Sequence, residues 1–192
     1  MKTLWIIRHG TTALNSEAGG EDRIRGWRNI PLNKEGHAEA ERLARKLRAS
    51  DIDVLYHSPL SRAADTAKAI AKTTGARLVA LDELKPWNVG DYTGEPTRDV
   101  HPILAKFCCE TPGKAIPGGE SFDSFMDRVF KGLRIATNGG GKHPAVVSHH
   151  RVERAVAAYI ANGQPADRKI DEKVFLSKGE PTAHAEKVNL KL

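Results

Sequence analysis

Cysteine is scarce in this chain: Cys108 and Cys109 are the only two among 192 residues. A disulfide between sequence neighbours is strained and two thiols are too few for a zinc site, so we expect both cysteines to be free. The sequence also lacks an apolar run near the roughly 20 residues that cross a bilayer. Met1 and Lys2 lead into a predicted strand and not into a cleavable leader. These absences favour a cytoplasmic protein with no membrane partner.

Aromatic residues are also few, at 6% of the chain, and the 30 Lys and Arg residues form no run of five or more. The formal net charge of +6 is therefore spread along the sequence. Nucleic-acid-binding modules usually gather basic residues on one face or carry aromatic recognition motifs. We therefore expect no nucleic-acid partner, and a cationic pocket for phosphate fits the charge better.

Strand and helix patterns alternate along the chain. Predicted strands cover residues 4–7, 53–57, 77–81, 145–148, 174–177 and 186–190, and predicted helices cover 34–48, 60–74, 97–109, 121–137 and 152–161. This order predicts an α/β fold with a mostly parallel central sheet and helices on both sides. We expect one domain over residues 1–192, with residues 162–192 as a tail that packs on the sheet.

Basic side chains stand at the junctions that follow the predicted strands. Arg8, His9 and Gly10 come directly after the first strand, Arg62 lies in the opening turn of the helix after the second strand, and His149 follows the strand that begins at residue 145. The carboxyl ends of strands face the ligand crevice in open parallel sheets. Two imidazoles and two guanidiniums are thus expected to line one crevice, where helix amino termini favour an anion.

Short motifs at these junctions follow one another over residues 1–160. They are Arg8-His9-Gly10 with Thr12 and Asn15, Arg25-Gly26-Trp27, Pro31-Leu32 with Gly36, Ser58-Pro59-Leu60-Ser61-Arg62-Ala63, Gly118-Gly119-Glu120-Ser121, and Val147-Ser148-His149. In this order they resemble the histidine phosphatase superfamily in its phosphoglycerate-mutase-like branch. The resemblance implies that fold and a phosphoric ester hydrolase, and we expect it to need no metal or other cofactor.

The resemblance also implies how the site would work. His9 would be the nucleophile and form a phosphohistidine, while Arg8, Arg62 and His149 bind the transferring phosphoryl group. Such a group spreads negative charge over three oxygens, which planar guanidiniums meet with paired donors. His9 must be neutral to attack, so its other ring nitrogen needs a hydrogen-bond acceptor.

Four further residues are candidates for phosphate or substrate binding. The resemblance implies that Gly10 and Asn15 help to hold the phosphate, although Asn is also common in turns. Arg25 either reaches a distal part of the substrate or is a solvated loop cation. Glu120 either lies over the phosphate site or caps the helix that begins at residue 121.

The resemblance breaks at the general acid, which the family carries as a Glu four residues before a glycine. Pro86 occupies that place before Gly90, and proline can neither give nor take a proton. Glu83 and His150 are the candidate replacements, with Asp91 behind them. A fourth alternative needs no acid, because a phosphohistidine, acyl phosphate or aryl phosphate leaves more readily than an alkyl phosphate.

The sequence therefore predicts a phosphatase that acts on a phosphate monoester or phosphoramidate. A phosphomutase is the first alternative, but family mutases carry an insertion after the second motif, and the compact run 77–119 favours water as the acceptor. A catalytically weak phosphate-binding module is the second alternative, which Pro86 supports. The expected partner is a small phosphorylated molecule or a protein phosphorylated on histidine, and a homodimer is left open.

Overall fold

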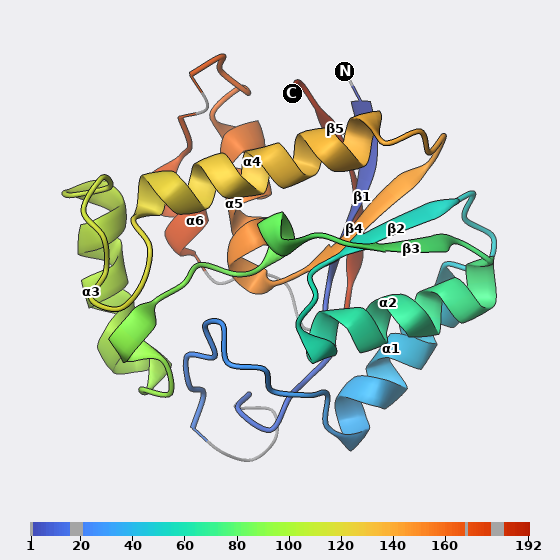
Figure 1. Ribbon diagram of the computed structural model, residues 1–192, viewed down its shortest axis with the longest axis horizontal. Coiled ribbons are helices and arrows are strands. Elements are labelled where there is room, and N and C mark those ends of the chain that lie inside the picture. Colours follow the sequence, from blue (N-terminus) through green and yellow to red (C-terminus); the bar gives the residue numbers. More distant parts are fainter. Residues whose placement is uncertain (1, 16–20, 168, 178–182) are drawn as a thin grey trace.

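The computed structural model describes residues 2–15, 21–167, 169–177 and 183–192. Five strands form one sheet in the order β3-β2-β4-β1-β5, seen at the centre of Figure 1. The strands are β1 (Lys2–Arg8), β2 (Val54–His57), β3 (Arg77–Ala80), β4 (Pro144–Ser148) and β5 (Ala185–Leu190). The first four run parallel to one another, and β5 pairs antiparallel with β1. The predicted mostly parallel sheet is confirmed.

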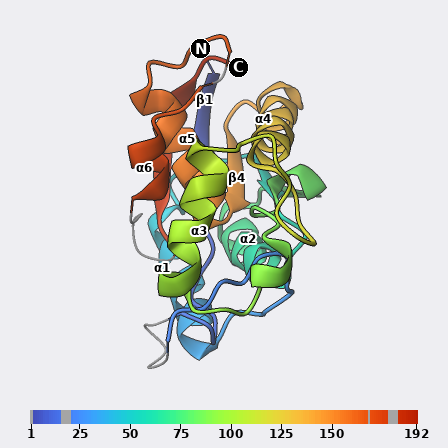
Figure 2. The same ribbon diagram turned by 90° about the vertical axis from the view of Figure 1, so that its left-hand side faces the viewer.

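Helices cover both faces of this sheet. The helices are α1 (Lys34–Lys46), α2 (Ser61–Thr74), α3 (Thr97–Cys109), α4 (Phe122–Asn138), α5 (His150–Ala161) and α6 (Glu172–Leu176), with short 3-10 turns η2 (Asp82–Leu84) and η3 (Gly90–Tyr92). In Figure 1, α1 and α2 lie below the strands and α4 lies above them. Figure 2 shows α3 in front of the sheet, at one end of the molecule.

The burial of β1 explains why this strand lies near the middle of the sheet. Leu4 and Ile6 belong to the larger apolar core, which α3 to α6 cover, whereas Ile7 belongs to the core beneath α1 and α2. Successive side chains of a strand point to opposite faces, so an unbroken apolar run requires cover on both sides. The sheet provides that cover and holds the end of β1 at a fixed place.

Local signals set two helix ends. The Asn33 side chain accepts a hydrogen bond from Gly36 N and caps α1, and Gly75 ends α2 with φ of +77°. The helix predicted over residues 60–74 begins one residue later than predicted, at Ser61, because Leu60 is still extended.

The expected strand at residues 174–177 is also wrong, because the chain forms α6 there. The Asp171 side chain accepts a hydrogen bond from Val174 N, as helix caps do. Phe175 then packs edge-on against Phe122, with ring centroids 5.0 Å apart. The expected strand near the end of the chain is confirmed as β5, so the tail adds a strand to the sheet edge.

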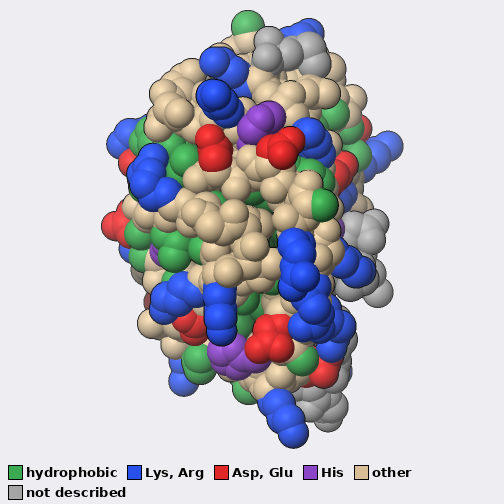
Figure 3. All heavy atoms as spheres, turned by 90° about the vertical axis from the view of Figure 1, so that its right-hand side faces the viewer, with side chains coloured by type: hydrophobic (Ala, Val, Ile, Leu, Met, Phe, Trp, Pro, Cys, Tyr) green, Lys and Arg blue, Asp and Glu red, His purple; other side chains and the backbone are tan. Residues whose placement is uncertain are grey.

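The surface carries charges of both signs. On the face in Figure 3, Lys and Arg side chains are interspersed with acidic and His side chains.

Both cysteines are free, as predicted, with Cys108 buried and Cys109 exposed. In the described ranges, no helix has the length and apolar character needed to pass through a membrane.

Candidate active site

The carboxyl ends of β1 and β4 lie side by side, which brings the predicted basic residues together. Arg8 pairs in register with Ser148, and His9 N donates to Ser148 O at 3.1 Å. A cleft of about 910 Å³ opens at this edge of the sheet. Of the predicted residues, those that line it are Arg8, His9, Asn15, Arg25, Arg62, His149 and His150. The sheet thus assembles one site from segments far apart in the sequence.

The ring of His9 is held in one tautomer. His9 is 3% exposed, and its Nδ1 lies 2.7 Å from the carbonyl oxygen of Gly10. A carbonyl oxygen can only accept, so Nδ1 carries the proton in the neutral ring and Nε2 carries the lone pair. This is the acceptor that a histidine nucleophile requires.

Arg62 is held by backbone carbonyl groups. Its guanidinium is buried and donates from Nη1 to Arg28 O at 2.9 Å and from Nη2 to Gly26 O at 3.0 Å. Its Nε donates to His149 Nδ1 at 3.3 Å. Two carbonyl groups of a single loop and one imidazole therefore fix the plane of the guanidinium.

His149 has the opposite tautomer to His9. Because Nδ1 accepts from Arg62, the neutral ring carries its proton on Nε2. That Nε2 is buried and has no hydrogen-bond partner among the described residues. The two rings meet edge to face with centroids 5.1 Å apart. A lone pair on His9 and an unsatisfied N–H on His149 thus occupy one small volume, which suits a phosphoryl group.

Burial lowers the pKa of both imidazoles. Burial and then the Arg62 charge lower the pKa of His9 and of His149 well below the usual 6.5. Burial lowers the pKa of Arg62 itself to about 9, and the charge of Arg25 adds to this effect. The imidazoles are consequently neutral at neutral pH, while the guanidinium stays charged.

The loop after β1 is shaped by its own polar groups. Gly10 N donates to Thr66 Oγ1 at 3.2 Å, and a Cβ at Gly10 would lie 2.4 Å from Gly36 O, so a larger residue does not fit. Asn15 Oδ1 accepts from the N–H and hydroxyl of Thr12, which leaves the Asn15 amide nitrogen as a donor for the cleft. Arg25 Nη1 donates to Leu14 O at 3.1 Å.

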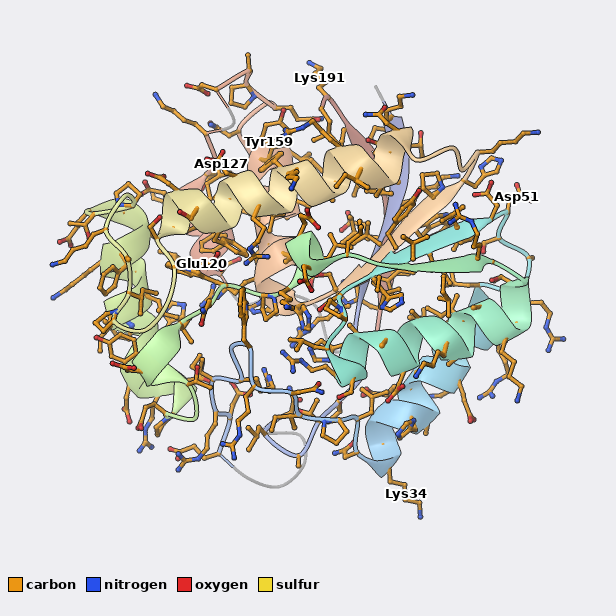
Figure 4. All side chains as sticks on the ribbon, in the orientation of Figure 1. Lys34, Asp51, Glu120, Asp127, Tyr159 and Lys191 are labelled. Atoms are coloured by element: carbon orange, nitrogen blue, oxygen red, sulfur yellow. The ribbon has the colours of Figure 1, made fainter. Side chains whose placement is uncertain are left out.

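Two predicted acidic residues do not reach the cleft. The Glu83 carboxylate lies 2.9 Å from Lys131 Nζ on α4, and the hydrogen bond to Lys131 lowers the pKa of Glu83. Glu120 lies at the amino end of α4, where Figure 4 labels it. Its side chain accepts from Asn88 N at 2.8 Å and pairs with Arg128, while Ser121 caps the helix. Neither predicted role of Glu120 is therefore found, because its carboxylate is engaged with a loop.

Pro86 lies on the wall of the cleft, together with Trp87. The Pro86 carbonyl oxygen accepts from Trp27 Nε1 at 2.8 Å and from Arg128 Nη2 at 3.1 Å. The Trp87 indole N–H donates to Glu120 O at 3.2 Å. With these polar groups engaged, this wall presents mainly carbon to the cleft.

A network of contacts links this wall to the basic cluster. Arg128 Nη1 donates to the carbonyl oxygens of Glu83 and Lys85, both at 2.9 Å, in addition to its bond with Pro86. Trp27 bonds the same Pro86 carbonyl, and the two residues beside Trp27 accept from Arg62. Arg128 and Trp27 were not predicted as a pair, because no local pattern shows that they share an acceptor.

Several other cleft residues were not predicted, and two of them carry basic side chains of interest. His101 and Arg151 both line it, from α3 and from the first turn of α5. Neither belongs to a motif, and only the position of Arg151 directly after the two histidines could have drawn attention to it. In the part of the chain that the structure describes, no three His, Cys, Asp or Glu side chains are grouped as metal ligands would be.

Comparisons with known proteins agree on one family. A model of the histidine phosphatase superfamily (branch 1) matches residues 4–173. The metal-independent phosphoserine phosphatase of Arabidopsis thaliana is 33% identical over 177 residues, which cover 88% of this chain and 73% of the relative. Phosphoglycerate mutase-like protein 4 of the same plant is 32% identical over 175 residues, covering 87% and 73%. The crystal structure of phosphoglycerate mutase from Thermus thermophilus superposes with a TM-score of 0.69 at 30% identity, covering 97% of this chain and 92% of that one.

Replacing Trp27 by Phe should weaken anion binding at the basic cluster. The change keeps the ring but removes the N–H that joins the Arg62-binding loop to Pro86. A neutral hydrogen bond contributes about 0.5–1.5 kcal/mol, so the dissociation constant for orthovanadate should rise about 2- to 10-fold. Trp5→Phe, on β1, is the matched control, and calorimetry gives both constants. Equal constants for the two variants would show that the network does not hold Arg62.

The protein should lose stability as the pH falls from 6.5 to 5.5. His9 and His149 have lowered pKa values and that of His150 is about 2, whereas unfolded histidines titrate near 6.5. The unfolded chain therefore binds more protons in this window, and each group lowers the free energy of unfolding by up to about 1.4 kcal/mol per pH unit. Urea unfolding at several pH values measures the slope. His150→Gln should flatten it and His37→Gln, at an exposed site on α1, should not.

Proposed function

The chain belongs to the histidine phosphatase superfamily, and from this premise we propose that it is a phosphatase that works through a covalent phosphohistidine on His9. The observation that supports this proposal is the pair of facing imidazoles, whose centroids lie 5.1 Å apart with Arg62 bonded to one of them. One ring offers a lone pair and the other an N–H, and a phosphoryl group needs both. Enzymes that transfer phosphoryl groups accelerate the reaction chiefly by positioning and electrostatic stabilisation.

In the first step, His9 Nε2 attacks phosphorus and the bond to the leaving oxygen or nitrogen breaks, with its electron pair going to the leaving group. Arg8, Arg62 and the N–H of His149 bind the three equatorial oxygens, and Asn15 adds a donor. In the second step, water attacks phosphorus, the N–P bond breaks, and its electron pair returns to Nε2. Orthophosphate then carries both protons of the water. No step in this scheme calls for a metal ion.

The leaving group is the point at which this chain differs from the family pattern. Pro86 stands where the family carries its acid, and it presents ring carbons to the cleft. Glu83 is paired with Lys131, and neither Glu83 nor Asp91 lines the cleft. His150 does line it, but burial and then the charge of Arg8 lower the pKa of His150 to about 2, so the ring is neutral at neutral pH and lacks the acidic proton of an imidazolium. We therefore propose that the physiological leaving group departs without taking a proton from the protein, either as a phenolate oxygen or as a phosphoramidate nitrogen that already carries its proton.

Because some relatives carry mutase names, a mutase is the alternative function. A mutase and a phosphatase differ in the acceptor of the phosphoryl group. A mutase returns the group to a second oxygen of the same organic molecule, whereas a phosphatase gives it to water. The test measures orthophosphate released from 3-phosphoglycerate against conversion to 2-phosphoglycerate. We propose water as the acceptor, and isomerisation without orthophosphate release would overturn this part of the proposal.

A phosphorylated His9 should be trapped with an aryl phosphate. The protein is mixed with 4-nitrophenyl phosphate, quenched in alkali and digested, and mass spectrometry should find a phosphoryl group on the peptide that contains His9. His9→Gln should remove the adduct and lower kcat by at least about 10³-fold, since removing a nucleophile costs that much or more. His37→Gln is the control. Orthovanadate binding with no adduct and no turnover would instead indicate a phosphate-binding module.

Phenyl phosphate should be hydrolysed much faster than benzyl phosphate. The two carry the same ring, but a phenolate is a far better leaving group than an alkoxide. General acid catalysis contributes about 10² to 10⁴ in rate, so its absence predicts a kcat/KM ratio of at least about 10². Pro86→Glu should raise benzyl phosphate turnover relative to Pro86→Ala. Comparable rates for the two substrates in the unmodified protein would mean that a proton donor operates, and His150→Gln would then identify or exclude His150.

A further inference from the structure

Arg151 is a cation of the cleft that the proposed chemistry does not use. It lies in the first turn of α5 and lines the cleft. Its guanidinium lies 5.3 Å from the ring centroid of Phe175, and its one hydrogen bond within the described residues runs from Nη1 to Phe175 O at 3.1 Å. The remaining N–H groups of this guanidinium are left for a ligand.

No carboxylate of the described residues neutralises Arg151. Burial lowers its pKa to about 10; the neighbouring Cys108 opposes this shift, and the charge of Arg154 adds to it. Two other arginines of the cleft have a carboxylate partner: Arg25 lies 3.4 Å from Asp22, and Arg98 lies 3.2 Å from Glu21. Arg151 is partly exposed in the cleft and has no carboxylate partner among the described residues, so an anionic group of a ligand can bring the counter-charge.

The surroundings of Arg151 are strongly positive. After burial, the charges that lower the pKa of His150 come, in decreasing order, from Arg8, Arg151, Arg154 and Arg25. The amino terminus of α5 adds the positive end of a helix dipole to the same region. A phosphoryl group bound by Arg8 and Arg62 would neutralise only part of this charge. The positive charge of Arg151 would remain without a counter-charge.

The cleft also has room for more than a phosphoryl group. Its volume of about 910 Å³ is near the upper end of the range for sites that hold a whole organic molecule. Leu104 of α3 and Leu176 of α6 line it together with Arg151. A substrate can thus reach from the imidazoles to Arg151 along a partly apolar wall.

We propose that Arg151 and the amino end of α5 form a second oxyanion subsite in this cleft. The leaving group of the substrate would then carry a further anionic group, a carboxylate or a second phosphate, which pairs with the Arg151 guanidinium. This inference rests on the proposed function, because the first subsite is the one that holds the reacting phosphoryl group. Arg151 is a binding residue for the leaving group and takes no part in the transfer step.

The test uses ligands that differ only in charge at the distal end. Isosteric pairs are 3- and 4-carboxybenzylphosphonate against the corresponding carboxamides, none of which can be hydrolysed. Calorimetry should show the carboxylate of the better-fitting isomer binding about 10- to 100-fold more tightly, as charge-assisted hydrogen bonds predict. Arg151→Gln should abolish the preference and Arg151→Lys should keep part of it. Arg154→Gln, which replaces an arginine outside the cleft lining, is the matched control.

The same pairs as aryl phosphates give the kinetic readout. The ratio of kcat/KM for 3- or 4-carboxyphenyl phosphate to that of its carboxamide should fall in Arg151→Gln, mostly through KM. A merely structural loss in this variant would lower both members of the pair and leave the ratio unchanged. Phenylene bisphosphates replace the carboxylate by a phosphate and show which oxyanion binds better.

Two results would overturn the proposal of a second subsite. One is equal affinity for the charged and neutral ligands, and the other is a preference for the carboxylate that survives in Arg151→Gln. Failure of the proposed function looks different, because it leaves no phosphohistidine and no orthophosphate from any substrate. The phosphonate affinities still decide the question of Arg151 in that case, since they require no turnover.

Discussion

A buried guanidinium without a carboxylate partner is the constraint around which this site is built. Arg62 is 1% exposed, and it is neutralised by no Asp or Glu of the described residues. An uncompensated buried charge costs several kcal/mol, so the protein surrounds it with carbonyl dipoles instead. Those dipoles come from residues 26 and 28, which explains why the long loop after β1 returns to the start of α2. The missing negative charge is the one that a phosphoryl group supplies.

The guanidinium also decides the protonation of the two histidines. By donating to His149 Nδ1 it forces the His149 proton onto Nε2, while the Gly10 carbonyl forces the His9 proton onto Nδ1. Two chemically identical rings thereby differ: His9 has a lone pair on Nε2, and His149 has an N–H there. Burial keeps both neutral, because a charged imidazole beside a guanidinium would add repulsion to the desolvation cost. The asymmetry comes from the hydrogen-bond partners and not from the residue type.

A second cation, Arg128, fixes the cleft wall that Pro86 and Trp87 form. Arg128 bonds three carbonyl oxygens of residues 83–86 and pairs with Glu120, whose carboxylate also binds Asn88 N. The Glu120 carboxylate is thus used to position a loop, and the carboxylate of Glu83, a candidate proton donor, is paired with Lys131. These contacts leave the wall at Pro86 mainly apolar, and Arg151 lines the same cleft.

A residue's role in the site could be predicted from the sequence where its position next to a strand or helix end decides that role. It could not be predicted where a contact with a residue far away in the sequence decides it. The apolar run before Arg8 and His9 placed them at a strand terminus, and the motifs at Arg62 and His149 did the same, so the basic cluster was predictable. Residues 174–177 were assigned to a strand because a short apolar run fits either structure, and packing of Phe175 decided for a helix. Glu83 and Glu120 had suitable chemistry, but ion pairs with Lys131 and Arg128 hold them away from the cleft.

The sequence alone therefore determined the alternation of strands and helices up to residue 161 and which basic residues stand at their junctions, because periodicity, caps and turns are local. Only the tertiary structure decided the two tautomers, the apolar wall at Pro86 and the unpaired charge of Arg151. Each of these depends on which groups meet across the sheet edge, and a hydrogen bond or ion pair between remote residues leaves no periodic trace in the chain.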